Sequence, residues 1–221
     1  DIYKADKFIF AKGETIKISD GSGNENSKIT YGSNSGTIFV DNFDLSIFTI
    51  FGGSKDNTSV NSSSITMNGG TVAYIYGGGY GTSADKSASV VTASIEITGG
   101  NILATVFGGG LGYATVNETT ITISDAAIGR DVVAGGSNNN VTTPVNKVLK
   151  ATVNISDGTM GNPTIRGGVY GGGQSLAYVE TSEITVTGGT KRLLCASGSN
   201  GITNATKQNI DGKAQNNYLS N

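Results

Sequence analysis

Apolar and polar residues alternate in a motif that recurs along the chain. A period of two is typical of a β-strand with one buried face. The copies are TIKISDG, SITMNGG, SIEITGG, TITISDA, TVNISDG and EITVTGG, starting at residues 15, 64, 94, 120, 152 and 183. Their aliphatic positions form two columns, expected to point inward: Ile16, Ile65, Ile95, Ile121, Val153 and Ile184, and then Ile18, Met67, Ile97, Ile123, Ile155 and Val186. The alternate positions are polar, so we expect them to face solvent.

A second motif, an apolar segment that ends in small residues, is interleaved with the first. Its copies are SIFTIFGGS, VAYIYGGGY, LATVFGGGL, DVVAGGSN, RGGVYGGGQ and LLCASGSN, within residues 46–54, 72–80, 103–111, 131–138, 166–174 and 193–200. Alignment of these copies predicts one further column: Ile50, Ile75, Val106, Val133, Val169 and Cys195. Self-similarity at roughly 20–50 residues is typical of solenoids, propellers and arrays.

The order of the two motifs predicts an all-β fold, a parallel β-helix of about five or six coils. Each coil would contain a strand, a corner, a second short strand, a glycine-rich corner and a loop. Gly-Gly or Asp-Gly after the first strand supplies the left-handed backbone angles that a sharp corner needs. A propeller is the alternative, but its blades need roughly 40–45 residues of antiparallel strands, and steps as short as 25 residues leave too little chain.

The two ends repeat less well than the middle. We expect residues 1–45 to form an irregular N-terminal cap and first coil, residues 46–200 to form the repeats, and residues 201–221 to form a weak terminal coil or a junction. A cap would protect the exposed backbone of the first coil from edge-to-edge pairing. The polar end of the chain suggests a module, expected to be monomeric, of a longer protein.

Composition narrows the classes of partner. The chain of 221 residues has 34 glycines, two prolines, no histidine and one cysteine. Charged residues make up 14%, and the net charge is −2 without a basic stripe, so a nucleic-acid partner is not expected. No apolar run approaches the roughly 18 residues of a membrane span, so no membrane insertion is expected. The single Cys195 is expected to serve as a small apolar filler.

The residue after the second-motif column is often aromatic, which gives the strongest candidate for a binding site. If these rings point outward, they form a ladder along one edge of the solenoid, and exposed aromatic strips mark interaction surfaces. The opposite possibility, that the rings stack inside a corner, stays open. The candidate partner-binding residues are Phe51, Tyr76, Tyr80, Phe107, Leu111, Tyr113 and Tyr170, with loops 80–92, 111–118 and 137–149 beside them.

Catalysis is not expected from this sequence. Glycoside hydrolysis needs two carboxylates on one face, and the acids here do not share an outward column. Without histidine, no Ser-His or Cys-His pair can form. We therefore predict no catalytic residues, no metal and no cofactor. An ice-binding rank of Thr side chains is a minor alternative, because Glu96, Asn154 and Glu183 interrupt the polar columns.

The segments ITGGNILATVFGGGLG and ITMNGGTVAYIYGGGYG resemble glycine-rich repeats in large secreted or wall-attached proteins of Gram-positive gut bacteria. The resemblance covers approximately residues 46–200, and it implies a right-handed parallel β-helix. Some proteins with similar repeats are immunoglobulin-binding superantigens, so the resemblance implies an immunoglobulin variable domain as the leading candidate partner. No contact motif of that family carries over residue by residue.

Together these features favour a secreted or surface-displayed bacterial module of the adhesin type. We expect it to bind a host protein or glycoprotein through a rigid lateral face. A structural spacer of a large surface protein is the main alternative, and a polysaccharide lyase or glycoside hydrolase is a more distant one.

Overall fold

The structure is a computed structural model. It describes residues 49–56, 59–138, 145–159, 161, 163–195 and 198 with their side chains. It also describes the backbone of strands in residues 7–9, 15–18, 27–31, 35–40, 44–48, 202–210 and 213–218. The described residues contain strands, turns and bends but no helix, and therefore no helix of the length and apolar character needed to cross a membrane.

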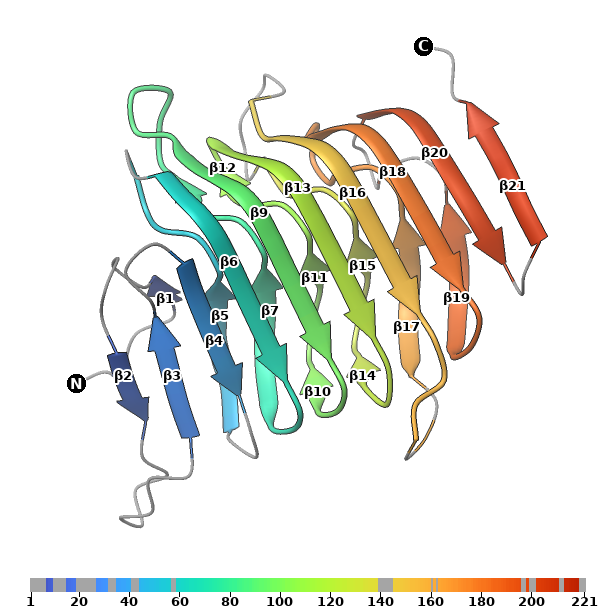
Figure 1. Cartoon of the computed structure of the whole chain (residues 1–221), viewed down its shortest axis with the longest axis horizontal. Helices are drawn as coiled ribbons and strands as arrows, with labels where there is room; N and C mark the ends of the chain where they lie inside the picture. The colour runs from blue at the N-terminus through green and yellow to red at the C-terminus, as the bar shows by residue number, and fades with distance from the viewer. Residues whose placement is uncertain are drawn as a thin grey trace.

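Parallel strands stack into a β-solenoid, which confirms the predicted fold class (Figure 1). It has about four turns, against the five or six coils expected from the number of motif copies. The longer strands lie in front in Figure 1, and we call them the front sheet. Its order is β2 (Thr15–Ile18), β3 (Ser27–Tyr31), β4 (Ser35–Val40), β6 (Ser59–Met67), β9 (Ala88–Ile97), β13 (Ala114–Ile123), β16 (Lys147–Ile155), β18 (Tyr178–Val186), β20 (Ile202–Ile210) and β21 (Lys213–Tyr218).

The other face of the solenoid is the back sheet, in which each coil places one or two short strands. Its strands are β1 (Lys7–Ile9), β5 (Asp44–Phe51), β7 (Thr71–Tyr76), β10 (Asn101–Ile102), β11 (Val106–Phe107), β14 (Ala127–Ile128), β15 (Val132–Val133), β17 (Thr164–Tyr170) and β19 (Thr190–Cys195). A short third row begins with β8 (Tyr80–Gly81) and β12 (Leu111–Gly112), and single β-bridges extend it at Lys55, Ser137 and Gln174.

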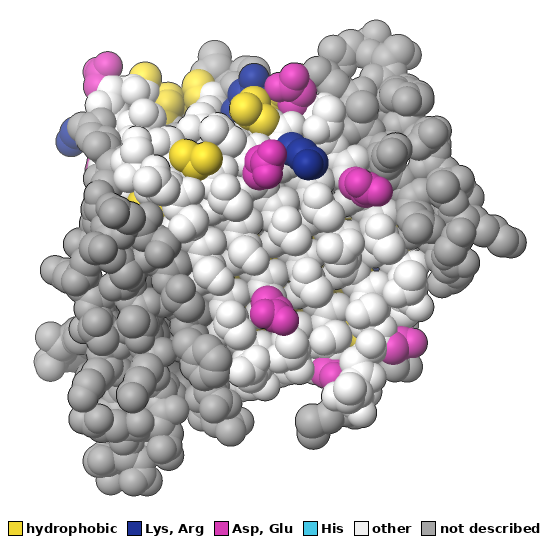
Figure 2. Space-filling model, viewed as in Figure 1, with side chains coloured by type: hydrophobic (Ala, Val, Ile, Leu, Met, Phe, Trp, Pro, Cys, Tyr) yellow, Lys and Arg dark blue, Asp and Glu magenta, His cyan; other side chains and the backbone are white. Residues whose placement is uncertain are grey.

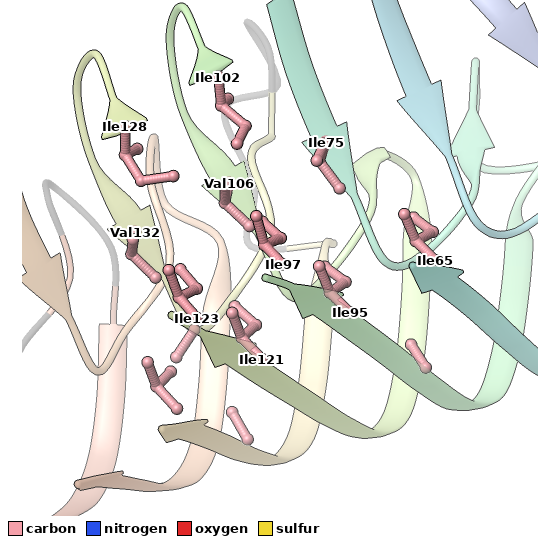
Figure 3. Packing of buried hydrophobic residues seen from close by; sticks show 14 of the residues in the cluster. Ile65, Ile75, Ile95, Ile97, Ile102, Val106, Ile121, Ile123, Ile128 and Val132 are labelled. Atoms are coloured by element: carbon pink, nitrogen blue, oxygen red, sulfur yellow. The ribbon is translucent and has the colours of Figure 1, made fainter. Parts of the chain in front are cut away.

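The core lies between the front and back sheets. Both predicted front-sheet columns are paired in register from β6 to β18, as Ile65 with Ile95 and Met67 with Ile97 illustrate. All members of these columns from Ile65 onward are at most 1% exposed. They meet Ile75, Val106 and Val132 of the back sheet in one aliphatic cluster (Figure 3).

Two parts of the predicted alignment are wrong. Ile16 belongs to β2, which pairs antiparallel with β3, and the residue that pairs with Ile65 is Ile38. In the back sheet, Val132 and Leu194 pair with Val169 in the inward column, so Val133 and Cys195 are displaced by one position. For Val133 the reason is that Ala134 occupies the place of the first corner glycine. Alignment on the first glycine of that copy therefore shifted the register.

The predicted loops are shorter than expected, because the front strands begin earlier. Val90 is buried near the start of β9, as are its counterparts Val116, Val148 and Val179 in the next strands. Two consecutive exposed residues, Val91 and Thr92 in β9, then interrupt the alternation. This change of phase hides the first half of each strand from a search for period two. Residues 139–144 of the predicted loop 137–149 lie outside the described residues.

The two kinds of corner use glycine for different reasons. After the front strands, Gly70, Gly100 and Asp125 have positive φ angles of 78°, 91° and 52°, which confirms the predicted left-handed corners. In the glycine triplets the requirement is space. A Cβ atom on Gly109 would lie 2.6 Å from the backbone nitrogen of Gly136 on the next coil, too close for any side chain.

The outer face of the front sheet is mainly polar and sparsely charged, with a few hydrophobic side chains near its upper end (Figure 2). Its columns pair as predicted, for example Ser64 with Ser94 and Thr66 with Glu96. In the second half of β9 and β13 the outward positions alternate with buried ones, so this face does not contribute to the core.

Candidate functional site: a groove beside an aromatic ladder

The aromatic column forms a stacked ladder on the outer surface of the back sheet. Phe51, Tyr76 and Phe107 are paired in register from coil to coil, each directly after an inward aliphatic residue. The ring centroids of Phe51 and Tyr76 are 5.0 Å apart with an interplanar angle of 12°, and those of Tyr76 and Phe107 are 4.5 Å apart at 7°. The separations are close to the spacing of neighbouring strands, so the solenoid itself sets the stack.

This ladder is covered rather than exposed, which decides the question that the sequence leaves open. Phe51 and Phe107 are 0% and 1% exposed, and Tyr76 is 6% exposed. With Leu111 and Val133 they form a second cluster, separate from the aliphatic core. Of the two alternatives, the solvent-exposed strip is excluded for these side chains, which stack under cover although they point away from the interior of the solenoid. They contribute packing, and of the three only Tyr76 and Phe107 reach the lining of the groove described below.

The third row is what covers the ladder. Tyr80 stacks on Phe51 with ring centroids 5.8 Å apart, and Leu111 packs in the same cluster. Backbone hydrogen bonds tie this row together, including Tyr80 N–H to Ser54 O at 3.0 Å and Leu111 N–H to Gly79 O at 2.9 Å. Because two or three glycines turn the chain immediately after each of these aromatic residues, the next residues fold back beside the rings.

Hydroxyl groups from the front sheet fix the corner that follows each ring. Ser63 Oγ donates to the carbonyl of Gly77 at 2.8 Å, and Thr119 Oγ1 donates to the carbonyl of Gly108 at 2.9 Å. Both hydroxyl residues are buried inward members of the front strands. The corner after Tyr76 and the corner after Phe107 are thus held to the opposite sheet.

A groove of about 360 Å³ lies between the back sheet and the third row. Its lining residues lie in or beside the successive strands β5, β7, β11, β15 and β17, so the groove extends along the axis of the solenoid. One side of the groove is formed by back-sheet residues, which belong to the ladder or precede it in the chain. The opposite side is formed by residues of the third row. The lining residues are Thr49, Tyr74, Tyr76, Thr105, Phe107, Leu111, Arg130, Ser137, Gln174 and Ser175.

The lining is mainly neutral and polar. Thr49, Thr105 and Ser137 are 8%, 2% and 7% exposed, so little of their surface is free to contact a ligand. Arg130 is exposed and is the only charged side chain among the described residues that line the groove. Burial, reinforced by neighbouring Tyr74, raises the pKa of the Tyr76 hydroxyl well above its usual range, so Tyr76 remains a neutral hydrogen-bonding group.

Tyr170 ends the ladder in a different way. Its counterpart on the preceding coil is Val133, so no ring links it to Phe107. Its own ring lies against Gly168, where an added Cβ would be 2.7 Å from Tyr170 Cε2. Partial burial, together with the charge of Asp131, raises the pKa of the Tyr170 hydroxyl. The Asp131 carboxylate itself accepts a hydrogen bond from the Gly168 N–H at 2.8 Å.

The structure thus brings together six of the seven predicted site residues: Phe51, Tyr76, Tyr80, Phe107, Leu111 and Tyr170. Tyr113 is partly buried but belongs neither to this cluster nor to the groove lining. The sequence analysis missed the polar lining residues, above all Arg130 and Gln174. Arg130 gave no signal because it stands between motif copies, where no column could be assigned.

A buried asparagine supports the third row from behind. The inward column Ala88, Ala114 and Ala177 is occupied in the intervening coil by Asn146, which is 0% exposed. Its Nδ2 donates to the carbonyls of Gly110 at 2.9 Å and Gly112 at 3.1 Å, and more distantly to that of Ser137. Its backbone N–H donates to Asn138 Oδ1 at 3.0 Å. Asn146 therefore holds both Leu111 and Ser137 at the edge of the groove.

Among the described residues, no group of three or more His, Cys, Asp or Glu side chains is arranged to hold a metal ion. No protein-family model matches the chain, and neither a curated protein nor a solved structure gives a significant match. The function must therefore be argued from the geometry of the groove.

Proposed function

We propose that this chain is a non-catalytic binding module, secreted or displayed on a bacterial surface, that recognises a host protein or glycoprotein through the lateral groove. The observation that carries the proposal is the groove itself. It extends along the solenoid axis from β5 to β17, it has an aromatic floor, and its walls offer hydroxyl, amide and guanidinium groups. Concave sites with an apolar floor and a few convergent polar groups are the usual form of ligand sites.

Rigidity supports the same proposal. The floor is a ring stack on a hydrogen-bonded sheet, and the rim is held by Asn146 and by the third-row hydrogen bonds. A preformed site loses little conformational entropy on binding, so modest contacts repeated along the axis can sum to useful affinity. The resemblance noted in the sequence makes an immunoglobulin variable domain the leading protein partner, with other host glycoproteins next.

The test is to fill the groove without changing the fold. Gln174→Trp places a bulky ring at the groove wall, and Leu176→Trp adds a similar ring at a side chain that is 41% exposed and lies outside the lining. Binding of immobilised immunoglobulin Fab fragments and mucin-type glycoproteins would be measured by surface plasmon resonance. We expect Gln174→Trp to weaken binding by about tenfold or more, as for a residue at a binding hot spot, and Leu176→Trp to leave it unchanged.

Equal binding by the wild type and both variants would place recognition elsewhere on the molecule. Binding of no host macromolecule by the wild type would favour the spacer. That alternative is supported by the regular polar outer face of the front sheet (Figure 2).

A further inference from the structure

The lining of the groove narrows the kind of ligand that would occupy it, given the proposed function on which this inference rests. The polar groups are hydroxyls and an amide, which both donate and accept hydrogen bonds. Thr49 and Thr105 lie in the back sheet on either side of Tyr74, whereas Ser137 and Gln174 are bridged on neighbouring coils of the third row, about 4.8 Å apart. This distance is similar to the advance per ring in an extended sugar chain. Neutral donor–acceptor groups on both sides of a groove that runs along the axis match a polyhydroxylated chain lying parallel to the axis.

Arg130 adds a charge requirement. Its side chain is exposed, and within the described part of the chain it forms no ion pair. The adjacent Asp131 does not line the groove, and its carboxylate accepts the Gly168 N–H. The backbone of Arg130 is held by hydrogen bonds to both neighbouring coils. Arg130 N–H donates to Ala104 O at 2.9 Å, and Gly167 N–H donates to Arg130 O at 2.7 Å. A guanidinium group in such a place is suited to bidentate recognition of a carboxylate.

From this geometry we infer that the groove binds a carboxylate-bearing glycan, with its chain along the solenoid axis and an acidic sugar at Arg130. The ring edges of Tyr74 and Tyr76 and the side chain of Leu111 contact the apolar faces of the sugar units, and the more accessible Gln174 and Ser175 bind their hydroxyl groups. The carboxylate can belong to a uronate in a polysaccharide or to a sialate at the end of a glycoprotein glycan, and the experiment separates these sources.

The test uses isothermal titration calorimetry with the whole chain and four probes. Galacturonate oligomers are compared with their methyl esters, and a sialylated N-glycan is compared with the same glycan after removal of sialate. We expect one acidic probe to bind, and we expect the affinity of its neutral counterpart to be lower by about tenfold or more. The reason is that hydrogen bonds to charged groups contribute more than those between neutral groups. Affinity for the acidic probe should fall as salt rises.

Matched arginine variants locate the charge. Arg130→Gln should weaken binding of the acidic probe by about tenfold and leave the neutral probe unchanged, while Arg130→Lys should retain part of the affinity. The control is Arg166→Gln, which removes an exposed arginine from β17 on the neighbouring coil and outside the groove lining. It should bind like the wild type.

Three results would overturn the inference. Neutral and acidic probes could bind equally, Arg166→Gln could weaken binding as much as Arg130→Gln, or none of the four glycans could bind. If no glycan binds while glycoproteins still bind in a manner sensitive to Gln174→Trp, the glycan inference is wrong and the proposed function stands. If Gln174→Trp also leaves glycoprotein binding unchanged, both are wrong.

Discussion

The molecule contains two stacks of buried side chains that differ in how they are covered. The aliphatic stack, represented by Ile121 and Ile123, lies between the front and back sheets and is enclosed by the coil to which it belongs. The aromatic ladder of Phe51, Tyr76 and Phe107 points out of the coil, and it becomes buried only because the third row folds back over it. The first stack is a consequence of alternation. The second depends on a corner, and the corner leaves a groove beside it.

This difference has a functional meaning. A stack enclosed by its own coil has no access to a ligand. A stack covered from one side by a narrow row has an edge, and the edges of Tyr76, Phe107 and Leu111 line the groove. The same covering that removes the aromatic residues from solvent therefore creates the candidate site.

The largest expected effect comes from truncating each stack. Phe107→Ala should lower the free energy of unfolding by about 3–5 kcal/mol and Ile121→Ala by about 2–5 kcal/mol, because both leave a cavity at a fully buried position. Urea unfolding followed by circular dichroism would measure both. Thr120→Ala, on the exposed face of the same strand β13, is the control and should change stability by less than about 0.5 kcal/mol. A change as small as the control for Phe107→Ala would show that the ladder is an exposed strip after all.

The next effect concerns the support of the third row. Asn146→Ala should cost about 1–3 kcal/mol, because the carbonyls of Gly110 and Gly112 lose a buried donor. Alanine fits the site sterically, as Ala114 and Ala177 occupy it in the neighbouring coils. Asn154→Ala, on the outward face of the same strand β16, is the matched control and should have little effect. If the two variants unfold alike in urea, Asn146 does not brace the groove.

The smallest effect on stability at neutral pH is expected for Tyr76→Phe. This change is also the most selective one, because the aliphatic stack has no group that titrates. The folded-state pKa of Tyr76 is raised above its ordinary value of 10.0, so the folded form retains the proton more strongly than the unfolded chain. The resulting stabilisation is fully present below pH 10 and is lost as the pH rises through the folded pKa. Tyr76→Phe should have nearly wild-type stability at pH 7 and should lose less stability than the wild type above pH 10. Parallel alkaline melting curves for the two proteins would contradict burial of this hydroxyl.

The sequence predicts the front sheet well because its information is local. Ile95 and Ile97 lie two positions apart with polar neighbours, and the same pattern in the next copy must pair in register or bury polar groups. The back sheet was harder to predict because its strands β11 and β15 contain only two residues each, too few for any period. There the alignment depended on the glycines, and Ala134 in the place of one glycine was enough to displace Val133.

The sequence alone determined that this protein is a parallel β-solenoid and that the aliphatic columns of its front sheet face inward. It also determined that aromatic residues recur directly after the inward column of the second motif. These are properties of spacing, and stacking of the coils enforces them. Only the tertiary structure decided that the rings are buried, that the third row covers them, and that Arg130, Ser137 and Gln174 meet beside them in one groove. The physical reason is that the direction of a side chain follows from local alternation, whereas its exposure depends on which distant segment packs against it.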